Sequence, residues 1–185
     1  MNYFCADTHF GHANIVAYCN RPYSNTDEMD EAIFANLEAL PTDCTLWILG
    51  DVAMRGSEFA EGIAKRLASL PYKIKILGGN HDKGKTKIYQ KHGLLEHKSG
   101  RAIYDIDGLK VSMGHYPMTD DEVPVRGSLY LHGHVHDKFK FKTFGTFENW
   151  HINCNVGVDV WGMKPVTMEQ ILKEREEFHT NLFNK

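Results

Sequence analysis

The sequence predicts an α/β fold with polar side chains gathered at the carboxyl ends of its strands. Short apolar runs alternate with helical patterns in the first half of the chain, and each run ends at a candidate metal ligand. Strand and helix alternation of this kind is typical of α/β proteins. In open α/β sheets, the loops at the carboxyl ends of the strands converge on one edge, where they form the site.

The first half of the chain predicts three strands separated by two helices. The strands are expected at Tyr3–Ala6, Leu46–Leu49 and Lys73–Leu77. Apolar residues at helical spacing predict the two helices. Their apolar faces consist of Met29, Ile33, Leu37 and Leu40 in the first and of Phe59, Ile63, Leu67 and Leu70 in the second.

The second half predicts more antiparallel structure. Asp107 and Gly108 separate two apolar runs and predict a tight hairpin turn. The segment Thr167-Met-Glu-Gln170 resembles a capping box, which predicts a helix that continues to about Phe178. The strands of this half are expected at Arg101–Ile106, Leu109–Met113, Leu129–His132 and Ile152–Val158.

Composition restricts the class of protein. The chain has 185 residues, 42% hydrophobic and 24% charged, which suits one globular domain over residues 1–185. A formal charge of −3 argues against long nucleic acid as a partner, although a local basic patch stays open. The first ligand candidate follows the N-terminus too closely for a signal peptide, and no run reaches membrane-spanning length. Four cysteines without a Cys-x-x-Cys pair fit reduced thiols, so we expect a cytoplasmic protein with no membrane partner.

Candidate metal ligands lie in five separate loops. Imidazole binds borderline transition metals, and a carboxylate can bridge two cations. Five of the 11 histidines fall in these loops, so the enrichment is local. The pattern indicates a pair of divalent cations, such as Mn, Fe or Zn. The motifs are Asp7-Thr-His9, Gly50-Asp51, Gly79-Asn80-His81-Asp82, Gly114-His115 and Gly133-His134-Val-His136.

In this order, the motifs resemble those of the calcineurin-like metallophosphoesterase family. Segments beginning at Gly11 and Asn20 resemble its bacterial and phage-type branch of small phosphoesterases. The resemblance implies a two-sheet β-sandwich flanked by helices, with the metal site at the C-terminal ends of strands. It also implies a ligand set: Asp7, His9 and His136 on one metal, Asn80, His115 and His134 on the other, and Asp51 bridging them.

The resemblance makes His81 the catalytic acid, because the matching histidine of the family faces the leaving group without binding metal. As imidazolium it would protonate the departing alkoxide, whereas the structural alternative is a turn cap. Protein phosphatases of the superfamily orient this histidine with an aspartate, but Met54 stands at that position here. Arg55 matches a phosphate-contacting arginine, with a solvated surface residue as the alternative.

Further substrate contacts are expected just beyond the first motif. His12, Asn14 and Arg21 could reach a substrate, or serve as capping and surface residues. The alternation from Lys138 to Lys142, followed by Phe144, Phe147 and Trp150, permits a base-stacking platform. A half-buried strand explains that alternation better. The other histidines are expected to be structural or at the surface: His92, His97, His132, His151 and His179.

The sequence as a whole predicts a hydrolase that cleaves phosphate esters with a hydroxide activated by two metals. Met54 argues against phosphoprotein substrates and favours a small phosphate ester, with a nucleotide-type phosphodiester as the leading candidate. A small-molecule phosphomonoesterase is the alternative within this chemistry. A non-catalytic, metal-binding interaction scaffold is the alternative outside it. Neither the native metals nor the oligomeric state follows from the sequence.

Overall fold

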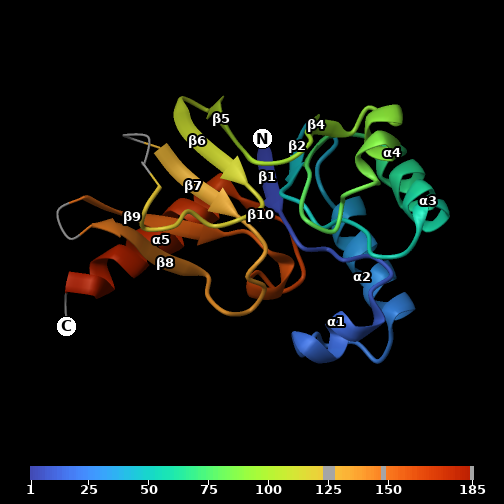
Figure 1. Ribbon diagram of the computed structural model, residues 1–185, viewed down its shortest axis with the longest axis horizontal. Helices are drawn as coiled ribbons and strands as arrows, with labels where there is room; N and C mark the ends of the chain where they lie inside the picture. The colour runs from blue at the N-terminus through green and yellow to red at the C-terminus, as the bar shows by residue number, and fades with distance from the viewer. Residues whose placement is uncertain (123–127, 147–148, 184–185) are drawn as a thin grey trace.

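The computed structural model describes residues 1–122, 128–146 and 149–183, and its architecture is a two-sheet sandwich with helices on the outside (Figure 1). Each sheet has five strands of mixed direction. The predicted α/β fold, with two sheets and flanking helices, is confirmed.

The first sheet is mainly parallel and comes from the first half of the chain. Its strand order is β10-β1-β2-β3-β4, and only the short β10 runs antiparallel to its neighbour. Parallel pairing brings the carboxyl ends of the three central strands to one edge of the sheet. The strands are β1 (Asn2–Cys5), β2 (Thr45–Ile48), β3 (Lys73–Leu77), β4 (Leu95–His97) and β10 (Val166–Thr167).

The second sheet has the order β5-β6-β7-β9-β8, with β6, β7 and β9 parallel and both outer strands antiparallel. Asp107 and Gly108 form the predicted turn between β5 and β6, with φ values of 54° and 80°. The strands are β5 (Arg101–Ile106), β6 (Leu109–Gly114), β7 (Ser128–His132), β8 (Phe141–Thr146) and β9 (Asn149–Asn155).

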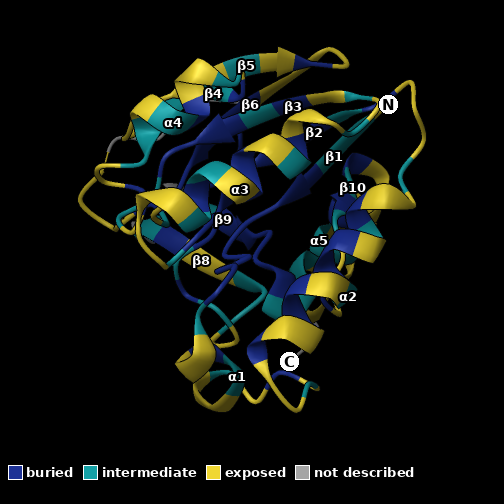
Figure 2. Ribbon diagram, turned by 90° about the vertical axis from the view of Figure 1, so that its right-hand side faces the viewer, coloured by how far each residue is buried: buried dark blue, intermediate teal, exposed yellow. Residues whose placement is uncertain are grey.

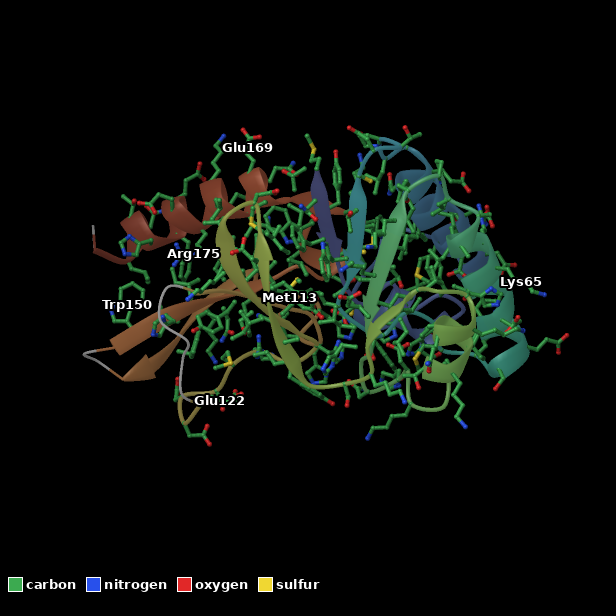
Figure 3. All side chains as sticks on the ribbon, turned by 90° about the horizontal axis from the view of Figure 1, so that it is seen from above. Lys65, Met113, Glu122, Trp150, Glu169 and Arg175 are labelled. Carbon is green, nitrogen blue, oxygen red and sulfur yellow. The ribbon has the colours of Figure 1, made fainter. Side chains whose placement is uncertain are left out.

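Two apolar cores hold these layers together. Helices α2, α3 and α4 cover the outer face of the first sheet, with their exposed sides toward solvent (Figure 2). The second core lies between the sheets, where Phe4 and Trp47 of the first sheet meet Met113 and Leu131 of the second. Figure 3 shows Met113 near the centre of the molecule. The helices are α1 (Ala13–Tyr18), α2 (Thr26–Glu38), α3 (Ser57–Ala68), α4 (Thr86–Lys91), α5 (Met168–Phe183) and the 3-10 turn η1 (Val158–Val160).

Helix α5 closes the open end of the inter-sheet core. Met168 and Ile171 are buried there with strand residues of both sheets. The predicted capping box is confirmed, because the Gln170 N–H donates to Thr167 Oγ1 and the Thr167 N–H donates to Gln170 Oε1. The helix continues beyond the predicted end at Phe178. No helix within the described ranges is long and apolar enough to cross a membrane.

The segment from Lys138 to Lys142, in which Lys and Phe alternate, does not form one regular strand. Strand β8 begins only at Phe141, which packs against Trp161 and Phe178 on the side of α5. Phe144 is buried on the opposite face, while Phe139 lies before the strand. Phe147, which belongs to the base-stacking alternative, lies outside the described residues.

Candidate metal centre

The predicted ligands converge where the carboxyl ends of both sheets meet. Each lies in the loop directly after a strand: Asp7 after β1, Asp51 after β2, Asn80 after β3, His115 after β6 and His134 after β7. His9 and His136 follow two residues further along their loops. The structure therefore brings together side chains that are up to 129 residues apart in sequence, as in the Asp7, His9 and His136 group.

One group of potential ligands consists of Asp7, His9 and His136, whose ligand atoms lie within 4.8 Å of one another. The Asp7 carboxylate is fully buried and accepts the His134 N–H at 2.8 Å. Both ring nitrogens of His9 are buried without a hydrogen-bond partner among the described residues. Because buried polar atoms are costly to leave unpaired, this group fits a metal ion.

A second group adjoins the first and consists of Asp51, His115 and His134. Asn80 belongs with it, because its side-chain oxygen lies 2.9 Å from His115 Nε2 and 3.1 Å from His134 Nδ1. Asp51 Oδ2 lies 3.2 Å from His115 Nε2 and 3.7 Å from His9 Nε2. Asp51 therefore lies between the two groups.

Burial and mutual charge shift the titration of these groups in opposite directions. Burial raises the pKa of Asp7 to about 6 and lowers the pKa of His9 to about 2. Burial would also raise the pKa of Asp51, but its hydrogen bond with His115 and the histidine charge lower it to about 2. The same carboxylates outweigh burial at His115 and raise its pKa to about 9. A bound cation must displace the His115 proton, so metal binding here releases protons.

The backbone of the ligand loops is strained. Eight non-glycine residues among those described have positive φ, and five of them belong to the predicted ligand set. A left-handed conformation at such residues costs roughly 1–3 kcal/mol each and persists where surrounding structure enforces it. These outliers concentrate at a functional site. They are Asp7 (57°), His9 (52°), Asp51 (54°), His134 (71°) and His136 (51°).

Two positions in the ligand loops require glycine, because ligand side chains lie very close to the backbone there. Gly50 has a φ of 90°, and a β-carbon there would lie 2.7 Å from His115 Nδ1. A β-carbon on Gly133 would lie 2.6 Å from Asp7 Oδ2. Only glycine lets the backbone pass so near these side chains.

The geometry agrees with the family comparison. The sequence model of the family described as calcineurin-like phosphoesterase matches residues 3–163, which include all seven predicted ligands. The chain belongs to the calcineurin-like phosphoesterase family. It is therefore a metal-dependent phosphoesterase by family and by its candidate ligand groups.

The chain is similar over most of its length to proteins of an archaeon and of two phages and to one solved structure. A protein of Methanocaldococcus jannaschii is 30% identical over 176 residues, covering 92% of this chain and 89% of its own length. The Gene 66 proteins of two Mycobacterium phages are each 24% identical and cover 86% and 96% of this chain, and 88% and 98% of their own. A crystal structure of a protein of unknown function from Aquifex aeolicus has a TM-score of 0.67 and 25% identity, covering 94% of this chain and 98% of that one.

The residues predicted to contact substrate in this calcineurin-like phosphoesterase have different environments. The His81 side chain is 45% exposed, and its Nε2 lies 4.0 Å from Asp51 Oδ2. His12 is half-buried, with its ring 5.5 Å from the His9 ring. Asn14 is exposed on α1. Arg55 is also exposed, and its Nε donates to the Gly11 carbonyl while its guanidinium lies over Phe59.

Arg21 does not face a substrate, which corrects the prediction for this residue. Its side chain has no exposed surface, and its nitrogens donate to Asp159, to the Thr8 carbonyl and to the Asp7 carbonyl. The guanidinium lies behind the first ligand loop and holds its backbone. Arg21 therefore supports Asp7, because the hydrogen bonds that its nitrogens donate all go to groups inside the protein.

Two supporting residues were missed from the sequence. Asp159 Oδ2 lies 3.0 Å from His136 Nδ1 and also accepts from Arg21, so it fixes the orientation of the His136 ring. Asn155 is fully buried, and its amide donates to the His136 and Phe139 carbonyls. The strand before Asp159 contains several polar residues, and Val158 separates Asp159 from Gly157, so the local signal that marks Asp51 is missing there.

Asp82, the last residue of the Gly79-Asn80-His81-Asp82 motif, is a buried clamp between two ligand loops. Its Oδ2 accepts the N–H groups of Asp51 at 2.7 Å and Gly79 at 2.9 Å. Its Oδ1 accepts the Val52 N–H and the Tyr89 hydroxyl. One carboxylate therefore ties the loop after β2 to the loop after β3.

We predict that Asp82→Ala destabilises the protein by about 3 kcal/mol or more, because it leaves several buried donors unpaired. Tyr89→Phe is the matched control. It removes a single neutral donor to the same carboxylate and should cost about 1 kcal/mol. Urea denaturation measures both. Equal losses of stability in the two variants would show that Asp82 does not act as the clamp.

Proposed function

We propose that this protein is a dinuclear metal-dependent phosphodiesterase that acts on small diesters of nucleotide type. The observation that supports it best is the pair of adjoining ligand groups with Asp51 between them. The first metal would be held by Asp7, His9 and His136. The second would be held by Asn80, His115 and His134, and Asp51 would bridge.

The donor set suits Mn, Fe or Zn, because it mixes imidazoles with carboxylates and an amide oxygen. When bound, two such cations supply an activated water near neutral pH and polarise a phosphoryl oxygen. The chain itself keeps the ligands in place. The Asp159 carboxylate orients His136, and the Leu49 carbonyl orients His115 through Nδ1 at 2.9 Å.

His81 is the proposed proton donor to the leaving group. Its backbone N–H donates to Asp51 Oδ1 at 2.9 Å, and its carbonyl accepts from Lys85 Nζ. The backbone is therefore held on both sides while the ring stays half-exposed at the edge of the ligand groups. This restraint of the backbone would orient His81, which lacks the aspartate at whose position Met54 stands.

A phosphodiester fits this site better than a phosphomonoester. A monoester brings a second negative charge, which phosphatases commonly match with an arginine fork. Here Arg21 is enclosed behind the ligand loop, and Arg55 donates to a carbonyl at the outer edge. Arg55 stays a candidate contact for a phosphoryl oxygen, as His12 and Asn14 do for the rest of the substrate.

We predict about two divalent metals per chain after saturation, with activity lost to a chelator. Asp51→Asn should lower metal content below that of the parent protein, because it removes the shared charge at nearly constant size. Asp137→Asn, at an exposed carboxylate, is the control. Elemental analysis after gel filtration gives the metal content. One metal or fewer in the saturated parent, together with activity that survives the chelator, would contradict the proposal.

His81→Ala should retain its metals but lose roughly 10²–10⁴-fold in kcat on alkyl esters, the usual contribution of a general acid. The loss should shrink for nitrophenyl esters, whose leaving group needs little protonation. His97→Ala, on the exposed β4 strand, is the control. The same loss on both kinds of ester would rule out the role of proton donor.

The phosphodiester preference is tested by kcat/KM. We expect a higher value for a linear dinucleotide or a cyclic nucleotide than for the matched nucleoside monophosphate, measured with each candidate metal. A diester's single charge is easier to accommodate here because, among the described residues, Arg21 is enclosed behind the ligand loop and Arg55 donates to a carbonyl. A clear preference for the monophosphate would replace this proposal with a phosphomonoesterase.

A further inference from the structure

A pocket lies next to the ligand loops. It is on the face of the second sheet that points away from the first sheet. Leu129 and Leu131 of β7 point into the inter-sheet core, so Tyr130 between them points outward. A pocket of about 310 Å³ opens on this outer face. Its lining includes Met118, Val135, Phe139, Lys142, Phe144 and Asn153, together with the carboxylate of Asp120.

The pocket adjoins the candidate metal centre along the chain and in space. Val135 lines it and stands between the predicted ligands His134 and His136. Met118 lines its other side, three residues after His115. Tyr116 is 51% exposed, and its ring lies 4.4 Å from the His134 ring. An exposed aromatic side chain therefore lies beside the ligands, at the residue directly before the lining residue Pro117.

Hydrogen bonds from buried side-chain amides hold the walls of the pocket in place. Asn153 is buried, and its side chain donates to the Met118 carbonyl and accepts the Met118 N–H, both at 2.9 Å. This double hydrogen bond fixes the loop after β6 against β9. Asn155 holds the opposite wall through the Phe139 carbonyl. Both walls are thus held by buried amides.

The lining chemistry suits a planar, polar ring. Phe139 offers an aromatic face, and Lys142 Nζ lies 5.6 Å from its ring centroid. Met118, Val135 and Phe144 add apolar surface. The volume is at the lower end of the range for small-molecule sites, which start at roughly 300 Å³. Aromatic stacking with a nearby cation is how proteins bind nucleobases without sequence readout.

Strand alternation does not account for this arrangement. Lys140 and Phe141 are neighbours in sequence, yet both lie on the side of α5: Phe141 packs against Phe178, and Lys140 pairs with Glu174 and lies over Trp161. Phe139 and Lys142 instead line the outer pocket. The segment from Lys138 to Lys142 therefore supplies two different faces of the protein.

We infer that this pocket, together with Tyr116 beside the ligands, binds the base of one nucleoside of the substrate while the phosphodiester lies at the metal centre. The inference rests on the proposed function and names the part of the substrate that the protein recognises. Tyr116 and Phe139 provide the stacking surfaces, and Lys142 provides the cation.

A dinucleotide and its two abasic analogues, each lacking one base, test this inference in the metal-loaded protein. One analogue should lose between about 5- and 150-fold in kcat/KM, the range that base stacking gives. The variants Phe139→Leu and Lys142→Ala should each reduce that base-dependent ratio by at least about threefold. Lys140→Ala, on the other face, is the matched control and should leave the ratio unchanged.

The outcomes separate this inference from the proposed function. Equal turnover of the dinucleotide and both abasic analogues would leave the phosphodiesterase intact and overturn the pocket assignment. So would equal ratios in Phe139→Leu and Lys140→Ala. Because the Lys142 side chain is exposed, Lys142→Ala tests the pocket even if Phe139→Leu fails to fold. Hydrolysis of the monophosphate alone would overturn the proposed function, and the inference with it.

Discussion

Two carboxylates, Asp7 and Asp51, are buried next to histidine side chains. The arrangement of the loops and sheets around them follows from this burial. Asp7 and Asp51 are almost inaccessible to solvent, as are His9 and His115. Charges removed from water in this way require partners or cations. Asp51 finds them in His115 and the His81 N–H, whereas Asp7 relies on the His134 N–H and on the charge of nearby histidines. The buried negative charge that these partners leave uncompensated is the physical reason for regarding this cluster as a metal centre.

The two sheets meet that constraint by holding the ligand loops rigidly. Left-handed backbone at five ligand residues raises the energy of their loops, and the regular strands that precede these loops hold them in place. The first sheet supplies Asp7, Asp51 and Asn80, and the second supplies His115 and His134. Neither sheet contains a complete ligand set, so the packing of one sheet on the other assembles the centre.

Buried polar side chains then connect the ligand loops from behind. Asp82 joins the loops after β2 and β3, and the Arg21 and Asp159 pair joins the first loop to η1. Asn155 ties the loop of His136 to β9. Each of these groups has several hydrogen bonds, as a polar group in a dry interior must. They position the ligands, and they leave the exposed rim to His81, His12 and Tyr116.

The sequence alone predicted the strands that precede the ligand loops, and it predicted the candidate ligands that the fold brings together, because both signals are local. A short apolar run followed by glycine, carboxylate or histidine is visible within a few residues, and five such runs indicated one site. The capping box at Thr167 and the turn at Asp107 are local in the same way. Strands with few apolar residues, such as β4 and β10, gave no such signal.

Which polar residues support the site depends on contacts between segments that are far apart in sequence. Asp159 binds Arg21 across 138 residues of sequence, and Asn153 binds Met118 across 35. Arg21 was predicted to face substrate because it follows the first motif closely, yet its direction depends on where Asp159 lies. The segment from Lys138 to Lys142 is ambiguous for the same reason. Periodicity gives the alternation of side chains, but the neighbouring elements determine which surfaces those side chains meet.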